Sequence, residues 1–216
     1  MLLILCRPPS NLTPLNKNLV ACKAKMMNSR IASLLIFAFF FLISSSATIA
    51  FHITRILRKY PEFSTYNHYL IKTNLQSQID QQPNITILAV DNKAISSISK
   101  KPMNVIKNIL SLHVLHDYYD VEKLVRVLTS KTAIFATLYQ TNNGETVSLK
   151  GFLEASMVNE GEIVFGSAAL GSGLTVKLVK PVLSHPHTIS VLQITAPIIA
   201  PGIGASSPVK FPASDN

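Results

Sequence analysis

Apolar residues downstream of position 50 recur at three- and four-residue intervals, the spacing of short helices that cover a core. Residues 53–60 predict one such helix, and Pro61 ends it because proline lacks the backbone N–H that a helix interior needs. A second helix is expected at residues 62–72. Its core-facing stripe consists of Phe63, Tyr66, Tyr69 and Leu70. We interpret the polar residues 76–83 as a linker.

The stretch NITILAV at residues 84–90 predicts a buried strand, because it is rich in β-branched residues. Asp91 and Asn92 then form a polar turn before a short helix at residues 94–98. Pro102 starts a further helix. The apolar face of that helix carries Val105, Ile106, Ile109 and Leu110.

The run SLHVLHDYYD, residues 111–120, is expected to continue as a strand. Asp120 at its end predicts the N-cap of a helix over residues 121–128, because a carboxylate there accepts a bond from a free backbone N–H. Beyond Ser130 the pattern changes to short β-type runs separated by turn residues. These runs are KTAIFATLYQ, TVSLKGF, EIVFGS, LTVKLVKPVL and TISVLQI. Helices first and hairpins later predict an α+β fold, a compact sheet or sandwich covered on one side by helices.

Residues 26–50 have the anatomy of a secretory signal peptide, with a basic start, an apolar stretch at residues 31–43 and a small polar end. We expect cleavage after Ala47 or Ala50, with Ala50 favoured, because the peptidase accepts only small side chains before the cut. The alternative is an uncleaved membrane anchor, since residues 31–51 carry no charge.

The rest of the chain divides around one folded domain, expected at residues 51–203. Residues 1–25 precede the signal, and we interpret them as an extension that is not native to the protein. Residues 204–216 are rich in Pro, Ala and Ser and predict a disordered tail.

The net charge of +9 points to nucleic-acid binding until it is divided along the chain. Residues 1–50 contain five basic and no acidic residues, which leaves 15 basic against 11 acidic residues, or +4, for the remainder. These charges are scattered, so we expect no nucleic-acid partner. Cys6 and Cys22 both lie before the apolar stretch of the signal. The mature chain is therefore expected to have neither a disulfide nor a reactive thiol.

One run of the sequence combines imidazole and carboxylate groups, the residue types that bind zinc or relay protons. It contains His113, His116, Asp117 and Asp120. On a strand, His113 and His116 point to opposite faces, so we expect no bound metal. We interpret His113 as a buried structural residue.

Other candidates for chemistry fit turns better than sites. The Gly-Ser-Gly sequence at residues 171–173 lacks the G-x-S-x-G pattern of a serine hydrolase and predicts a hairpin loop. His185 and His187, on either side of Pro186, fit an exposed turn. The sequence carries no phosphate loop, dinucleotide fingerprint or carboxylate pair, so we expect no catalytic residues and no cofactor.

Five stretches together resemble a plant fasciclin-like arabinogalactan protein over residues 51 to about 203. They are YPEFSTYNHYL, NITILAVDNKAI, NVIKNILSLHVLHDYYDVEKL, ATLYQTNNG and ISVLQITAPIIAPG. The two motifs that mark a fasciclin domain are among them, TILAVDN at residues 86–92 and LHVLHDYYD at residues 112–120. The resemblance implies a single fasciclin fold, a wedge of β-sheet with helices packed on one side. It also implies a cell-surface or cell-wall glycoprotein that serves adhesion, although the chain shows no signal for the lipid anchor that such proteins often carry.

Modification sites follow from the sequence and from this resemblance. The sequon at Asn84 predicts N-glycosylation at the start of the buried strand, whereas a second sequon at Asn11 precedes the export signal. The resemblance implies hydroxylation and arabinogalactan attachment at prolines that follow Ala or Ser, with Pro208 favoured over Pro201 and Pro197. Seven residues of the family motifs are interpreted as structural. They are Thr86, Leu88, Asp91, Asn92, His113, Tyr118 and Tyr119.

The sequence therefore predicts a secreted or cell-surface adhesion glycoprotein without catalytic activity. Its expected partners are cell-wall polysaccharides or other surface glycoproteins. Membrane association is expected only through an uncleaved signal or an anchor outside this chain. The alternative is a secreted carbohydrate-binding protein or hydrolase, which would show a deep cleft with convergent polar groups.

Overall fold

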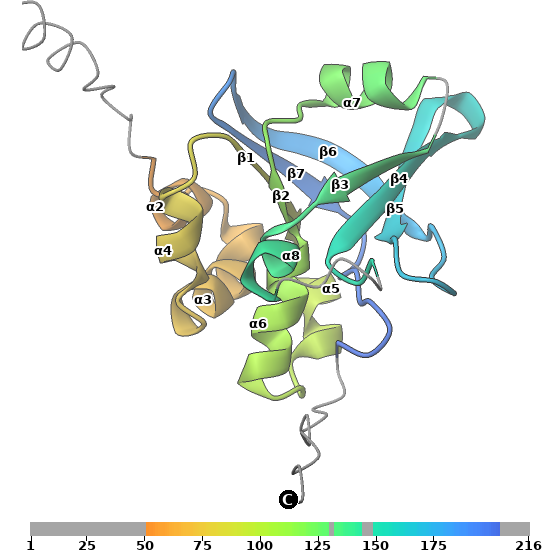
Figure 1. Ribbon diagram of the computed structural model, residues 1–216. Coiled ribbons are helices and arrows are strands. Elements are labelled where there is room, and N and C mark those ends of the chain that lie inside the picture. The colour runs from red at the N-terminus through yellow and green to blue at the C-terminus, as the bar shows by residue number, and fades with distance from the viewer. Residues whose placement is uncertain (1–50, 130–131, 144–148, 204–216) are drawn as a thin grey trace, which may run out of the picture. The chain divides into compact units, whose positions relative to one another are not determined.

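Helices dominate the first half of the folded region and strands the second in the computed structural model (Figure 1), which describes residues 51–129, 132–143 and 149–203. The helices are α2 (Ile53–Leu57), α3 (Ser64–Lys72), α4 (Leu75–Asp80), α5 (Asn92–Ile95), α6 (Met103–Leu112), α7 (Val121–Leu128) and α8 (Leu138–Asn143), with short 3-10 turns η1 (Pro61–Phe63), η2 (Ser96–Ile98) and η3 (Asn159–Gly161). The strands are β1 (Ile85–Val90), β2 (Val114–His116), β3 (Ala133–Ala136), β4 (Phe152–Val158), β5 (Glu162–Ser167), β6 (Val176–His185) and β7 (Ile189–Ile194). This arrangement confirms the α+β prediction.

The strands form one sheet in the order β2-β1-β7-β6-β5-β4-β3. β1 and β7 run parallel, with Ile85 opposite Ile189, and all the other neighbouring pairs are antiparallel. An isolated bridge between Leu115 and Thr137 joins the outer strands β2 and β3. The two halves of the sheet converge near α6 and diverge toward α7, which gives the sheet the shape of a wedge (Figure 1).

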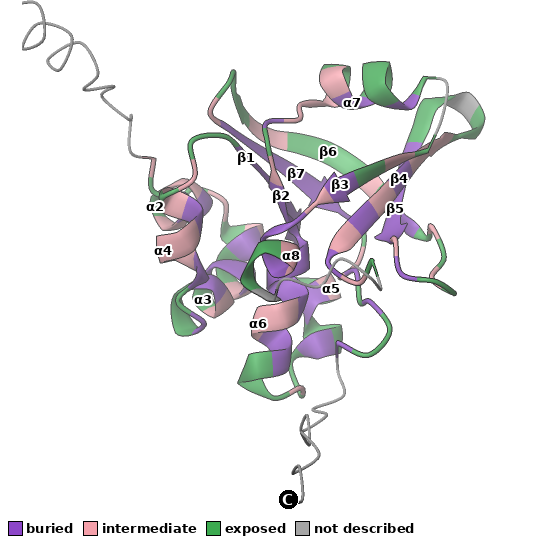
Figure 2. Cartoon of the chain, viewed as in Figure 1, coloured by how far each residue is buried: buried purple, intermediate pink, exposed green. Residues whose placement is uncertain are grey.

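The core lies where the helices meet the convergent end of the wedge. β1 and β7 are buried along their whole length (Figure 2), as the uninterrupted apolar run of β1 predicts for a strand covered on both faces. Helix α6 turns Ile106, Ile109 and Leu110 inward, and α3 contributes Tyr66 and Leu70. The chain has no Trp, so aliphatic side chains provide the packing together with Tyr66 and the fully buried Phe63 and Phe165.

The prediction of a linker at residues 76–83 is wrong in part. Residues 76–80 form helix α4 together with Leu75. Leu75 and Ile79 lie four positions apart and are both fully buried, so two apolar contacts hold a helix that is otherwise polar. Asp80 fixes its end, since its carboxylate accepts from the backbone N–H of Ile53 at 2.9 Å and contacts His52.

Two strand predictions also need correction. The strand expected at residues 111–120 is only three residues long, because α6 continues to Leu112 and Asp117 turns the chain with a positive φ of 82°. The expected run at residues 131–140 ends early, since Leu138 begins helix α8. Of the next predicted run, TVSLKGF at residues 146–152, the described residues 149–152 contribute only Phe152 to a strand, because β4 starts there.

No helix in residues 51–129, 132–143 and 149–203 is long and apolar enough to cross a bilayer. The predicted extension, signal and tail at residues 1–25, 26–50 and 204–216 lie outside the described residues.

Candidate functional site

The two motifs that carry the family resemblance bind each other across β1 and β2. The backbone N–H of Leu88 donates to the carbonyl of His113 at 2.8 Å. The Thr86 hydroxyl, fully buried, donates to the carbonyl of Asp117 at 3.0 Å and accepts from the backbone N–H of Tyr119 at 2.7 Å. Thr86 therefore fixes the turn that follows β2, where backbone groups have no strand partner.

His113 lies at the C-cap of α6, fully buried, rather than on the expected strand. Its Nδ1 donates to the carbonyl of Ile109 at 2.6 Å, and its Nε2 accepts from the backbone N–H of Ile198 at 3.0 Å. Because a carbonyl only accepts and an N–H only donates, the ring is the neutral Nδ1–H tautomer. Burial lowers the pKa of His113 to about 4, although the bond to Ile109 opposes this shift.

His116 has a separate environment at the end of β2. Its Nε2 lies 2.7 Å from the hydroxyl of Thr141, and partial burial lowers the pKa of the ring. The two histidines thus differ in environment because one caps a helix and the other ends a strand, not because they alternate along one strand. No group of three His, Cys, Asp or Glu side chains in the described part of the chain is placed to hold a metal ion.

Lys123 organises the residues between β2 and α7. Its ammonium donates to the Asp117 carboxylate at 3.0 Å and to the Tyr118 carbonyl at 2.7 Å, and it lies 4.5 Å from the ring centre of Tyr119. Burial alone raises the pKa of Asp117, but the hydrogen bonds from Lys123 and from the backbone N–H of Tyr118 outweigh it, so the pKa falls. Asp117 is therefore a carboxylate already bound to a cation.

Asp120 has two structural roles at the start of α7. One carboxylate oxygen accepts from the backbone N–H of Lys123 at 2.7 Å, which confirms the predicted N-cap, and this bond lowers the pKa of Asp120. The other oxygen accepts from the Tyr118 hydroxyl at 3.0 Å. That hydroxyl also contacts the Ser184 hydroxyl of β6 at 2.5 Å, so Tyr118 ties α7 to the sheet.

A recess of about 330 Å³, here called the Asn84 recess, opens beside these residues. It is lined by Asn84, Asp117, Tyr118, Asp120, Lys123, Arg126, Pro186 and His187. The rings of Tyr118 and His187 lie 6.2 Å apart at 38°, and together they form an aromatic wall. Asn84 is exposed at the start of β1, as its predicted glycosylation requires.

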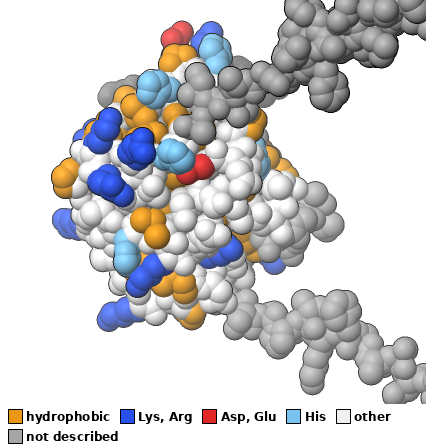
Figure 3. All heavy atoms as spheres, turned by 90° about the vertical axis from the view of Figure 1, so that its left-hand side faces the viewer, with side chains coloured by type: hydrophobic (Ala, Val, Ile, Leu, Met, Phe, Trp, Pro, Cys, Tyr) orange, Lys and Arg blue, Asp and Glu red, His pale blue; other side chains and the backbone are white. Residues whose placement is uncertain are grey.

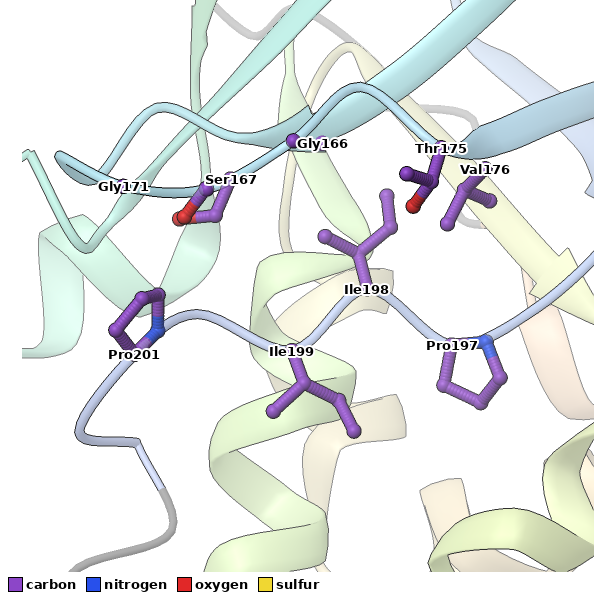
Figure 4. Close-up of a pocket in the computed structure, with 11 residues that line it drawn as sticks. Gly166, Ser167, Gly171, Thr175, Val176, Pro197, Ile198, Ile199 and Pro201 are labelled. Atoms are coloured by element: carbon purple, nitrogen blue, oxygen red, sulfur yellow. The ribbon is translucent and has the colours of Figure 1, made fainter.

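A second recess of about 330 Å³, here called the Ser172 recess, lies between the β5–β6 connection and residues 197–201. Ser167, Thr175 and Val176 point from one wall toward Ile198 on the other (Figure 4). Its walls come close because Gly166 approaches the backbone of Gly173, and a Cβ added to Gly166 would lie 2.3 Å from the Gly173 carbonyl oxygen.

The chemistry of the Ser172 recess is that of hydroxyls and backbone groups. Ser172 has a buried hydroxyl oxygen without a hydrogen-bond partner in the described part of the chain. The recess is lined by no residue that could serve as its base, since none of the described lining residues is His, Asp, Glu, Lys or Tyr. Among the described residues, the lining of the Ser172 recess therefore does not pair its serines with a general base.

The remaining predicted residues lie near these features. Asp91 accepts from the backbone N–H of Ala94 at 2.8 Å and caps α5, and Asn92 bonds the start of α3 through the backbone N–H of Thr65 at 2.9 Å. Pro197 is half-buried and Pro201 is exposed, and both line the Ser172 recess. Pro208 lies outside the described residues.

Sequence reasoning missed three contributors, Lys123, Ser184 and Ile198. Lys123 had a local signal, because a residue three positions after an N-cap faces back toward the turn. Ser184 and Ile198 had no such local signal, because their partners are distant in sequence. Ser184 of β6 contacts Tyr118, and Ile198, beyond β7, donates to His113.

Comparison with known proteins agrees with this architecture. The fasciclin domain pattern matches residues 61–184, more than half of the chain. The chain is 43% identical over 186 residues to fasciclin-like arabinogalactan protein 3 of Arabidopsis thaliana, and 41% identical over 185 residues to fasciclin-like arabinogalactan protein 14 of the same plant. These alignments cover 86% and 85% of this chain. The chain belongs to the fasciclin domain family and, within it, to the fasciclin-like arabinogalactan proteins.

Coverage of the relatives differs from one to the next. The chain spans 65% of protein 3 and 72% of protein 14, but only 42% of fasciclin-like arabinogalactan protein 10, to which it is 44% identical. Among solved structures, a FAS1 domain pair from the insect cell adhesion molecule fasciclin I matches with a TM-score of 0.52 and 18% identity. That match covers 66% of this chain and 47% of the pair, and it supports the fold.

Proposed function

We propose that this chain is a non-catalytic adhesion glycoprotein of the cell surface or cell wall. The observation that carries the proposal is the family match, which extends through almost the whole folded region and includes both diagnostic motifs. Under this proposal residues 26–50 direct export, residues 51–203 form the adhesive domain and residues 204–216 form a glycosylated tail.

The absence of catalysis is supported by how the reactive side chains are engaged. Both ring nitrogens of His113 bond the backbone, Asp117 is bound to Lys123, and Asp120 caps α7. These contacts stabilise the fold and leave the groups poorly placed to exchange protons with a substrate.

Glycosylation is supported by the exposure of the candidate residues. Asn84 precedes the buried strand but is itself exposed, and Pro201 is exposed at the domain's end. Pro197 is half-buried, so it is less accessible than Pro201 to the enzymes that hydroxylate and glycosylate proline. Pro208, in the proposed tail, is the third candidate proline for hydroxylation and arabinogalactan attachment.

An acidic polysaccharide is the partner that the charge distribution favours. Figure 3 shows Lys and Arg side chains gathered on the side of the domain that carries α2, α3 and α4. Arg55, Arg58 and Lys59 are exposed, and none of them forms an ion pair with another described residue. Arg58, the C-cap of α2, follows Arg55 by three positions and Lys59 is the next residue, so their like charges repel and an external anion relieves the repulsion.

Export and glycosylation are tested by intact-mass analysis of the protein purified from its native membrane or wall fraction, before and after deglycosylation. We expect a mature start near Phe51 and a mass that falls on removal of sugar. A chain that retains residues 1–50 and carries no sugar would contradict the proposed compartment.

The proposed partner is tested by binding of the purified glycoprotein to immobilised polygalacturonate, with a neutral glucan as the control surface. We expect Arg55→Glu/Arg58→Glu to reduce polygalacturonate binding at least tenfold, while Lys93→Glu/Lys100→Glu, an equal change of charge at exposed lysines elsewhere, leaves most of it. Equal losses in both double variants, or equal binding to the neutral glucan, would contradict the assignment of this surface.

A further inference from the structure

We propose that the first N-acetylglucosamine of a glycan on Asn84 packs into the Asn84 recess and stabilises the domain. This inference rests on the proposed function, because it requires an exported and glycosylated chain. It goes further in giving the glycan a fixed place on the protein surface rather than leaving it free in solvent.

The covalent step is the transfer of an oligosaccharide from a lipid diphosphate. A bond forms between Nδ2 of Asn84 and the anomeric carbon of the first sugar, and the bond from that carbon to the phosphate oxygen breaks. The lipid diphosphate leaves with the bonding electrons, and the amide loses one proton. The sequon threonine, Thr86, is buried in the folded domain, so transfer must precede the closing of β1 onto β2.

Asn84 is held at the mouth of the recess before any sugar is attached. When its amide nitrogen faces the neighbouring carbonyls, Nδ2 donates to His187 at 2.6 Å and to Pro83 at 2.9 Å. Glycosylation removes one of the two amide hydrogens, so at most one of these bonds is kept. The first sugar attached to this nitrogen therefore lies next to the β6–β7 turn, which contains Pro186 and His187.

The recess offers the surface that a pyranose ring needs. The exposed rings of His187 and Pro186 supply an apolar wall for the C–H face of the sugar, and the buried ring of Tyr118 packs behind His187. Lys123 and Arg126 supply donors for its hydroxyl and acetamide oxygens. Arg126 is free to turn, since its ion pair within the described residues is a 3.5 Å contact to Glu122 with both side chains largely exposed.

The size of the recess limits the contact to the start of the glycan. A volume of about 330 Å³ is at the lower end for small-molecule sites, so it accommodates about one sugar ring rather than a branched chain. Packing of that ring would cover the exposed Pro186 and His187, beside the buried Tyr118 whose hydroxyl links α7 to β6. The expected consequence is a higher melting temperature that depends on the first sugar alone.

The experiment compares glycoforms of the full chain made in cells that add high-mannose glycans. One endoglycosidase trims the glycan to a single N-acetylglucosamine, and the sugar-free form with Asn84 intact is made in cells that add no N-glycans, because amidase treatment would convert Asn84 to aspartate. We expect the single-sugar form to melt with the full glycoform, and the sugar-free form and Asn84→Gln to melt about 3 °C lower. A drop already present in the single-sugar form would overturn the inference.

A matched pair of variants localises the effect to the recess. His187→Asn removes the ring, and asparagine tolerates the positive φ of 61° at this position. His185→Asn changes an exposed histidine of the same turn that does not line the recess. We expect the difference in melting temperature between the single-sugar and sugar-free forms to disappear in His187→Asn and to persist in His185→Asn. A difference that persists in both variants would contradict packing of the sugar in the Asn84 recess.

Mass analysis separates the two possible failures. If Asn84 carries no sugar, both the proposed glycoprotein and this inference lose their basis at this residue. If Asn84 is occupied but all glycoforms melt together, the glycan projects into solvent, and only this inference is overturned.

Discussion

The backbone N–H of Ile198 donates to Nε2 of His113 at 3.0 Å, which joins positions 85 residues apart. The other ring nitrogen bonds the carbonyl of Ile109, in the last turn of α6. One imidazole therefore holds the segment that leaves β7 against the helix at the convergent end of the wedge. Because the ring is fully buried, this bond is both protected from water and sensitive to protonation.

The first prediction concerns the pH dependence of stability. The pKa of His113 is about 4 in the folded chain and near 6.5 when unfolded, so the unfolded chain binds the extra proton first as pH falls. The stability is fully present above pH 6.5 and is lost as pH falls from 6.5 toward 4, by roughly 3 kcal/mol. The free energy of unfolding should be measured by urea titration at pH 7, 5.5 and 4.5.

The control for this prediction is His113→Gln, which cannot titrate. His116, whose pKa is also lowered, contributes in the same direction, so part of the slope remains in this variant. We expect His113→Gln to lower stability at pH 7 and to flatten the pH dependence. A slope unchanged in His113→Gln would show that other groups cause the acid sensitivity.

The fold was predictable from sequence where one residue pattern decides the structure, and not where distant contacts decide it. The apolar run of β1 and the Asp120 cap are local, and both were predicted. Helix α4 was missed because only Leu75 and Ile79 mark it, and their burial depends on neighbouring helices. The residues of the candidate site were predicted from the sequence, but the contacts between them were not. Thr86 reaches Asp117 because β1 pairs with β2, and no local sequence pattern predicts that pairing.

The second prediction separates the two roles of Thr86. Thr86→Val removes the hydroxyl that serves Asp117 and Tyr119, and it leaves two backbone groups without a partner, at a cost of about 1–3 kcal/mol. Thr86→Ser keeps both the hydroxyl and the sequon, and Asn84→Gln removes the sequon while keeping the hydroxyl of Thr86. In unglycosylated protein we expect Thr86→Val to be the least stable of the three by urea unfolding. Equal stability of Thr86→Val and Thr86→Ser would mean that the hydroxyl has no structural role.

The third prediction contrasts two tyrosine hydroxyls. Tyr66 is fully buried with no hydrogen-bond partner for its hydroxyl in the described residues, and burial raises its pKa. Tyr66→Phe should therefore stabilise the domain by about 1 kcal/mol, because it removes an unsatisfied polar group. Tyr118→Phe should destabilise it by a similar amount, since it removes the bonds to Asp120 and Ser184. Thermal unfolding of the two variants beside the parent checks both signs, and changes of the same sign would contradict the contrast.

The last prediction tests the close approach that shapes the Ser172 recess. A Cβ at Gly166 would lie 2.3 Å from the Gly173 carbonyl oxygen, and backbone cannot yield as a side chain does, so Gly166→Ala must displace the β5–β6 connection at a cost of about 1–3 kcal/mol. A Cβ at Gly173 meets only the methyl of Thr175 at 3.5 Å, an ordinary contact, so Gly173→Ala should be neutral. Urea unfolding gives the stability of both variants, and amide hydrogen exchange should show faster exchange at residues 168–175 in Gly166→Ala alone. Matching behaviour of the two variants would mean that the connection does not press on β5, and the recess would then lose one of its walls.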